Sequence, residues 1–316
     1  MNGKKLWSIG GGKGGIGKSI FTLGLGITLA QMGKKIILID ADLGGANLHT
    51  LMGVRYPPFT LEDFILKRVD RLEDIIIETQ VEGIGLICGA DDIMGAANPK
   101  FAQKIRLLNQ LEDLPADLVL LDLGAGTSFN VLDFFNYSAG KIAVFTNQST
   151  SLQNVYGFIK SALFRFLSRE FSRDEEILLL LQQAGSRLSK LNSVGDILNH
   201  LQGKNGEKFT RLKQLIDRFE IFLVVNMVKT EMDRKAAQVI QKVCKDFLNL
   251  ETHIFGSLVH DPEVEKAVNQ MLPFPTQSQA SPAALGLQHI ATLFLKEADL
   301  GNEKTPLRLA ATGAWG

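Results

Sequence analysis

The chain has 316 residues, 45% of them hydrophobic, and its 34 lysines and arginines balance 34 aspartates and glutamates. This size allows one large domain with a substantial core, and the zero net charge excludes a general attraction to nucleic acid or anionic lipid. Cys88 and Cys244 form no CxxC pair, which excludes a disulfide framework and a cysteine-rich metal site. No apolar run approaches the roughly 18 residues of a membrane span, and the first strand begins almost at Met1, so we expect a cytoplasmic protein.

The first motif is a glycine-rich loop at residues 10–19, Gly-Gly-Gly-Lys-Gly-Gly-Ile-Gly-Lys-Ser, which matches the phosphate-loop (P-loop) pattern. The apolar run at 6–9 predicts a strand before it, and the pattern at 20–32 predicts a helix after it. Backbone N–H groups and the positive end of that helix can converge on phosphate oxygens there. We expect Lys18 to reach the β and γ phosphates and Ser19 to ligate Mg²⁺. The predicted nucleotide-binding residues of the loop are Gly12, Lys13, Gly14, Gly15, Ile16, Gly17, Lys18, Ser19 and Ile20.

Short apolar runs alternate with helical patterns along much of the chain. They lie at residues 36–40, 84–88, 118–122, 141–145, 221–226 and about 253–258. This alternation predicts an α/β fold with a mostly parallel, twisted sheet covered by helices on both faces. Ligands bind at the carboxyl ends of such strands, where Asp40, Asp42 and Asp122 fall. Asp122 stands at the Walker B position and is predicted to hold the metal, with capping of the next turn as the alternative.

The stretch from about residue 155 to 219 breaks the alternation. Apolar residues recur there at helical spacing in segments 155–166, 194–201 and 209–219, and Ser193 is placed to cap the second of these. The run at 177–181 fits both a strand and a buried helix. We predict one P-loop ATPase domain over residues 1–296 with a helical insertion at about 160–220, followed by a loose tail over 297–316.

Two motifs resemble the MinD/ParA branch of P-loop ATPases. Lys13, a second lysine inside the loop, is similar to the deviant Walker A signature, in which the extra lysine crosses a dimer interface to the partner's nucleotide. Residues 40–48, Asp-Ala-Asp-Leu-Gly-Gly-Ala-Asn-Leu, resemble switch I, whose second aspartate orients the attacking water and whose asparagine reaches the phosphate–water network. The alternative role for Asp42 is that of a helix N-cap or of an outer contact of the metal. The resemblance implies the catalytic residues Asp42, Lys13 and Lys18, the metal residues Ser19, Asp42 and Asp122, and a nucleotide contact by Asn47.

The same resemblance has two departures and two further matches. Residues 122–126 look like switch II, but Gly124 replaces the proline of the MinD pattern, and the added backbone freedom implies larger loop movement or slower turnover. Residues 147–148 are Asn-Gln where relatives usually have Pro-Glu. Asn226 matches the asparagine that reads adenine, and Pro275 matches the loop that packs on adenine.

The resemblance covers about residues 1–155 and 220–295 and is closest in style to MinD and to the flagellar-number regulator FlhG (FleN). It implies a switch in which ATP and Mg²⁺ stabilise a sandwich homodimer through Lys13. Slow, partner-stimulated hydrolysis through Asp42 then resets the switch. The implied cellular role is control of the placement or number of flagella, a pole or a division site, with a protein partner engaged through the helical insertion and transient location at the inner membrane face or a pole.

Three alternatives stay open. A ParA-like partition ATPase would bind DNA through the basic residues of the insertion, and a nucleotide-gated binding module would hydrolyse ATP negligibly. MinD-like membrane binding would need an amphipathic anchor, but residues 283–295 match the helix that closes the fold in relatives, and residues 306–315 are short and carry one arginine. The basic residues weighed for DNA binding are Lys204, Lys208, Arg211, Lys213 and Arg218.

Overall fold

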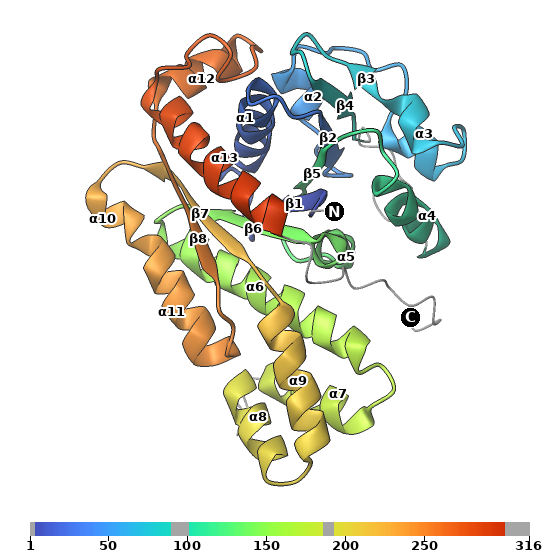
Figure 1. Cartoon of the computed structure of the whole chain (residues 1–316), viewed down its shortest axis with the longest axis vertical. Coiled ribbons are helices and arrows are strands. Elements are labelled where there is room, and N and C mark those ends of the chain that lie inside the picture. The colour runs from blue at the N-terminus through green and yellow to red at the C-terminus, as the bar shows by residue number, and fades with distance from the viewer. Residues whose placement is uncertain (1–3, 90–100, 186–192, 301–316) are drawn as a thin grey trace.

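The computed structural model describes residues 4–89, 101–185 and 193–300. A twisted sheet runs through the molecule between two helical layers, and helices α7, α8 and α9 project beyond it at the bottom of Figure 1. Within the described residues, eight strands form one sheet in the order β3-β4-β2-β5-β1-β6-β7-β8, in which β3 is antiparallel to β4 and the other neighbours are parallel. The strands are β1 Leu6–Gly10, β2 Ile36–Ala41, β3 Ile77–Glu78, β4 Ile84–Ile87, β5 Leu118–Leu123, β6 Gly140–Phe145, β7 Phe222–Val228 and β8 His253–Val259. The predicted α/β fold is confirmed.

The helices alternate with these strands through most of the chain. They are α1 Lys18–Gln31, α2 Leu48–Leu51, α3 Leu61–Ile65, the 3₁₀ helix η1 Leu72–Ile75, α4 Phe101–Leu111, α5 Phe129–Tyr137, α6 Ser149–Glu170, α7 Glu175–Gly185, α8 Val194–Gln202, α9 Gly206–Arg218, α10 Glu231–Arg234, α11 Ala236–Leu248, α12 Pro262–Asn269 and α13 Pro282–Leu300.

Each face of the sheet has its own core because successive strand residues point to opposite faces. In β2, Ile36 and Leu38 pack into the core shared with α1 and α13. Their neighbours Ile37 and Ile39 pack into the core shared with α4, α5, α6 and α11. The strands are therefore apolar along their whole length, as the uninterrupted runs in the sequence predict.

The helices between β6 and β7 form an extension that we call the α7–α9 lobe, residues 175–218. The run at 177–181, which fits a strand as well as a helix by sequence, lies in α7. Ser193 caps α8, because its Oγ accepts a hydrogen bond from the Asp196 N–H at 3.1 Å while the Asp196 carboxylate accepts one from the Ser193 N–H at 3.0 Å. Ile197 and Leu212 are fully buried in the same core as the sheet face below them, so the lobe extends that core.

Helix α13 packs its apolar face on the sheet. Leu287, Ile290 and Phe294 are buried against β1, β7 and β8, so the amphipathic character of residues 283–295 reflects core packing. The helix continues to Leu300, which makes residues 297–300 helical where the sequence predicted the start of the tail. The rest of that tail, including 306–315, lies outside the described residues. No helix of the described part is long and apolar enough to cross a membrane.

Candidate functional site

The glycine-rich loop between β1 and α1 is held by close contacts. Gly17 has φ 80° at the start of α1, and a Cβ there would lie 2.4 Å from Asn226 Nδ2. A Cβ at Gly12 would lie 2.1 Å from the backbone oxygen of Asn154 in α6. Both positions therefore require glycine. The loop backbone lies against α6 and the end of β7, with the positive end of α1 above the carboxyl edge of the sheet.

Three side chains of α1 lie near Asp122 at the end of β5. Thr22 Oγ1 donates to Asp122 Oδ1 at 3.1 Å, and the Ser19 hydroxyl also hydrogen-bonds to this carboxylate. Asp122 is buried, and burial together with the charge of Asp40 raises its pKa to about 7. The two hydrogen bonds and the buried Lys18 ammonium act in the opposite direction.

Asp40 lies beside Asp122 on the neighbouring strand β2 and is fully buried. Its carboxylate accepts hydrogen bonds from the backbone N–H groups of Asp42 at 3.2 Å, Asn47 at 2.8 Å and Leu48 at 2.9 Å. Burial raises the pKa of Asp40 to about 6, and these bonds lower it. Asp40 therefore folds the 42–47 loop back onto the strand end and fixes the start of α2. The sequence indicated Asp40 through the apolar run at residues 36–39, which the acid follows directly.

Oxygen donors from two elements meet at this place, as a magnesium site requires. The Ser19 hydroxyl and the Asp122 carboxylate are adjacent. Burial raises the pKa of Asp122 and so disfavours its ionised form, which a bound cation would favour. Both residues fit the predicted metal role. Asp42, the third predicted ligand, is half-buried, and its Oδ1 accepts the Gly44 N–H at 3.4 Å. Its metal role stays a prediction.

The residues after β5 lie between the loops that follow β1 and β2. A Cβ at Gly124 would lie 2.8 Å from Asp42 Oδ1, and a Cβ at Gly14 would lie 3.9 Å from the Cβ of Ala125. The structure therefore brings the P-loop and both predicted switch segments together at one edge of the sheet.

The half-buried Lys13 and the exposed Asn47 both form hydrogen bonds within the chain. Lys13 Nζ donates to Thr150 Oγ1 in the first turn of α6 at 3.2 Å. Asn47 Nδ2 donates to the Gly45 carbonyl at 2.5 Å. The contacts predicted for them, across a dimer interface and with the phosphate–water network, stay predictions.

Asn226 has a structural contact that the sequence did not indicate. Its Nδ2 donates to the Ile16 carbonyl at 2.8 Å, and its Oδ1 accepts the Met227 N–H at 2.9 Å. Asn226 thus anchors the P-loop backbone to the end of β7. Pro275 is buried in the connection between α12 and α13. The adenine contacts of Asn226 and Pro275 stay predictions.

The departure at residues 147–148 has a physical explanation. Asn147 Nδ2 donates to Asp233 Oδ1 at 2.7 Å, which links the loop after β6 to the start of α10. The same carboxylate accepts the backbone N–H groups of Lys229 and Thr230, each at 2.9 Å. These bonds lower the pKa of Asp233 to about 2. Proline at 147 could not donate this hydrogen bond.

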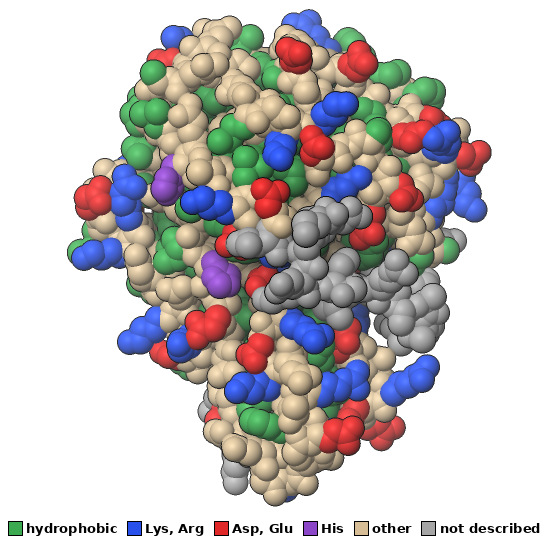
Figure 2. Space-filling view, viewed as in Figure 1, with side chains coloured by type: hydrophobic (Ala, Val, Ile, Leu, Met, Phe, Trp, Pro, Cys, Tyr) green, Lys and Arg blue, Asp and Glu red, His purple; other side chains and the backbone are tan. Residues whose placement is uncertain are grey.

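The basic residues weighed for DNA binding are partly engaged inside the molecule. Lys208 Nζ lies 2.9 Å from the Asp174 carboxylate and 2.7 Å from that of Glu176. Arg211 donates to the Glu170 carbonyl at 2.8 Å. Figure 2 shows acidic and basic side chains interspersed over the lobe on this face. The lobe therefore lacks a uniformly basic surface on this side.

The comparisons with known proteins agree with this geometry. The sequence model of the CobQ/CobB/MinD/ParA nucleotide binding domain matches residues 7–274. Antiactivator FleN of Pseudomonas aeruginosa is 29% identical over 162 residues, which are 51% of this chain and 57% of FleN. The flagellum site-determining protein YlxH of Helicobacter pylori is 32% identical over 161 residues, 49% of this chain and 53% of YlxH. The match thus spans little more than half the length of these two relatives.

The fold likeness extends further than the sequence likeness. The structure of MinD from Pyrococcus horikoshii, solved with Mg-ADP, has a TM-score of 0.64 at 21% identity and covers 95% of this chain and 99% of that chain. MinD of Aquifex aeolicus in its MinC complex has a TM-score of 0.60 at 18% identity, covering 96% and 98%. The resemblance to MinD/ParA-type ATPases that the motifs predicted is confirmed.

Proposed function

Because the chain belongs to the CobQ/CobB/MinD/ParA nucleotide-binding family, we propose that it is an ATP-dependent molecular switch. It binds ATP with Mg²⁺, forms a sandwich homodimer and hydrolyses ATP slowly, with stimulation by a protein partner. The observation that carries this proposal is the close approach of the P-loop, the Ser19–Asp122 pair and the Asp42 loop at one strand edge.

In this proposal each residue at the edge has a distinct role. The loop N–H groups and Lys18 bind the phosphates, and Ser19 and Asp122 hold the metal. Bound Mg²⁺ would neutralise phosphate charge. Asp42 orients the attacking water, and positioning of this kind contributes most of the catalysis in phosphoryl transfer. Asp40 holds the backbone of the Asp42 loop in place through its three hydrogen bonds.

Dimerisation would depend on Lys13. In the free chain its ammonium donates to Thr150, so it must leave that hydroxyl to reach the nucleotide of a second copy. For ATP to drive assembly, the nucleotide must bind the dimer more tightly than the monomer. Cross-interface contacts by Lys13 would supply this difference.

The cellular role that we propose is control of the placement or number of flagella or of another polar structure. The support is the similarity to proteins named as an antiactivator and as a flagellum site-determining protein. The switch would act in the cytoplasm with transient location at the inner membrane face or a pole. Its protein partner would bind the α7–α9 lobe.

Phosphate release and light scattering on purified protein test the switch. Wild type should form a dimer with ATP and Mg²⁺ and release phosphate slowly. Asp42→Ala should bind ATP but remain trapped as a dimer, and Lys18→Ala should neither bind nor dimerise. Equal phosphate release by wild type and Asp42→Ala would remove the catalytic assignment.

The role of Lys13 is tested separately. Lys13→Ala should bind ATP with nearly unchanged affinity by calorimetry, yet remain monomeric. A normal ATP-dependent dimer of this variant would contradict the cross-interface contact.

Imaging of a fluorescent fusion tests the cellular role. We expect a focus at the pole or at flagellar bases that disperses in the Lys18→Ala variant. Location on the nucleoid would favour DNA partition and contradict the proposed role. Uniform envelope staining without a polar or flagellar focus would contradict control of placement, although it would agree with location at the inner membrane face.

A further inference from the structure

Gly124 is the first residue after β5, and its hydrogen side chain makes room for one neighbour. An ideal Cβ at this position would lie 2.8 Å from Asp42 Oδ1, 3.1 Å from Cγ and 3.5 Å from Oδ2. The three nearest atoms thus belong to the same carboxylate. The φ of Gly124 lies outside the left-handed region, so its backbone conformation is open to other residues. The space that the glycine leaves is therefore occupied by the Asp42 carboxylate.

The Asp42 carboxylate is held less firmly than the loop that carries it. Its Oδ1 accepts the Gly44 N–H at 3.4 Å, which is a long and weak hydrogen bond. The loop backbone, by contrast, is held by the buried Asp40, whose carboxylate accepts the Asp42, Asn47 and Leu48 N–H groups. A side chain at 124 would therefore displace the carboxylate and leave the loop in place.

We propose that Gly124 is a positioning residue for Asp42. The missing side chain lets the carboxylate occupy the space beside residue 124, and this place sets the direction from which it orients water. The inference rests on the proposed function, in which Asp42 orients the attacking water. The contact gives Gly124 a steric role besides added backbone freedom, because a proline at 124, as in the MinD pattern, would place a Cβ where the carboxylate of this chain lies.

The test is a double-mutant cycle in single-turnover assays with labelled ATP, which follow slow reactions for hours. In Gly124→Ala the carboxylate must retreat from 2.8 Å to an ordinary contact beyond 3.4 Å. We expect the rate of hydrolysis to fall about tenfold, because misplacement on the ångström scale has effects of this order. ATP affinity, dimerisation and melting temperature should stay as in wild type. In the Asp42→Ala background, Gly124→Ala should cause no further loss.

A matched control adds a Cβ where nothing stands in its way. Gly157 of α6 has no atom within 4 Å of its ideal Cβ apart from its chain neighbours and its own helix backbone, and its φ lies outside the left-handed region. Gly157→Ala should therefore keep the wild-type rate. A wild-type rate in Gly124→Ala, or an equal loss with and without Asp42, would overturn the positioning role while leaving Asp42 catalytic. A wild-type rate in Asp42→Ala would overturn the proposed catalysis and this inference together.

A crystal structure of Gly124→Ala gives an independent measurement. The Asp42 carboxylate should turn away from residue 124 while the backbone of residues 42–47 keeps its bonds to Asp40. A displaced loop backbone, or an unmoved carboxylate, would contradict the proposal.

Discussion

Two regions of the molecule differ in how their residues affect stability. One is the carboxyl edge of the sheet with Asp40 and Asp122, which we call the strand edge, and the other is the α7–α9 lobe. At the edge, burial raises the pKa values of both carboxylates, so their ionised forms reduce the stability of the free protein. The lobe follows ordinary helix rules, with apolar residues such as Ile197 buried and α8 closed by a capping box. The edge thus places ionisable groups where they lower stability, whereas the lobe has the packing and capping that stabilise helices. Substitutions in the lobe should therefore change stability and leave ATP binding unchanged, whereas substitutions at the strand edge should change both.

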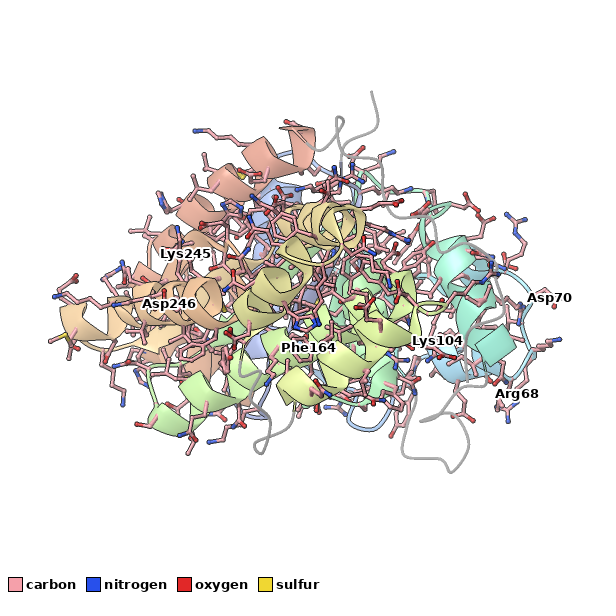
Figure 3. The ribbon with its side chains drawn as sticks, turned by 90° about the horizontal axis from the view of Figure 1, so that it is seen from below. Arg68, Asp70, Lys104, Phe164, Lys245 and Asp246 are labelled. Atoms are coloured by element: carbon pink, nitrogen blue, oxygen red, sulfur yellow. The ribbon has the colours of Figure 1, made fainter. Side chains whose placement is uncertain are left out.

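The largest effect is expected at Asp133, which lies outside both regions and links α5 to α4 and α6. This fully buried residue of α5 receives Lys104 Nζ at 2.7 Å, Arg165 Nε at 2.5 Å and the guanidinium of Arg169. Figure 3 shows Lys104, a residue of α4, well apart from Lys245 and Asp246 of α11. Asp133→Ala leaves three cations around an uncharged site and should lower the free energy of unfolding by about 3–5 kcal/mol.

Urea denaturation measures this loss, with Glu251→Ala as the control. Glu251 pairs with Lys245 at 2.8 Å where both side chains are about two-thirds exposed, so this variant should unfold at nearly the wild-type urea concentration. Equal midpoints for the two variants would show that the Asp133 cluster does not hold α4, α5 and α6 together.

The next effect tests whether the lobe is part of the domain. Ile197→Ala removes a fully buried side chain of α8 and should cost about 2–4 kcal/mol. Because the core around Ile197 is continuous with one face of the sheet, denaturation should remain a single transition by circular dichroism and by tryptophan fluorescence. Affinity for ATP should not change. Two separate transitions would show that the lobe unfolds alone, contrary to the predicted single domain.

The contrast between the regions also explains what the sequence could predict. The P-loop and Asp122 follow from local patterns, since a glycine-rich turn and a strand-terminal acid have few other uses beside each other. Helices α8 and α9 of the lobe follow from apolar spacing and from Ser193. These features are local, so the order of residues is sufficient to find them.

Contacts between distant segments were the part that patterns missed. The hydrogen bond of Asn226 to Ile16 and that of Asn147 to Asp233 join loops more than 80 residues apart in sequence. Asp40 was expected only to lie at the edge, because its bonds to the 42–47 loop depend on how that loop folds back. The run at 177–181 stayed ambiguous because a short apolar run has no decisive period.

A pH experiment sharpens the contrast at the edge. The pKa of Asp122 is about 7 in the folded chain against 3.8 unfolded, so the folded state binds more protons between about pH 4 and 7. The free energy of unfolding without nucleotide should therefore fall as pH rises through this window. Asp122→Asn should reduce the slope and, at pH 7.5, make the free protein more stable than wild type by about 2 kcal/mol.

Urea titrations of both proteins at several pH values measure this slope. Asp40, whose pKa is raised to about 6, remains in the variant, so the slope should decrease without vanishing. Calorimetry with ATP and Mg²⁺ should show that the more stable variant binds the nucleotide more weakly. An unchanged dependence of the free energy of unfolding on pH would mean that burial does not raise the pKa of Asp122 in the free protein.

The smallest effect concerns the cap of α8. Ser193→Ala removes the acceptor for the Asp196 N–H and should lower the free energy of unfolding by about 1 kcal/mol. Ser193→Thr keeps a hydroxyl and is the matched control, with stability close to wild type. Phosphate release should be the same in all three proteins, because the cap stabilises the lobe and contacts no part of the strand edge. A slower turnover in Ser193→Ala alone would mean that order in the lobe is transmitted to the P-loop, and the separation between the two regions would then not hold.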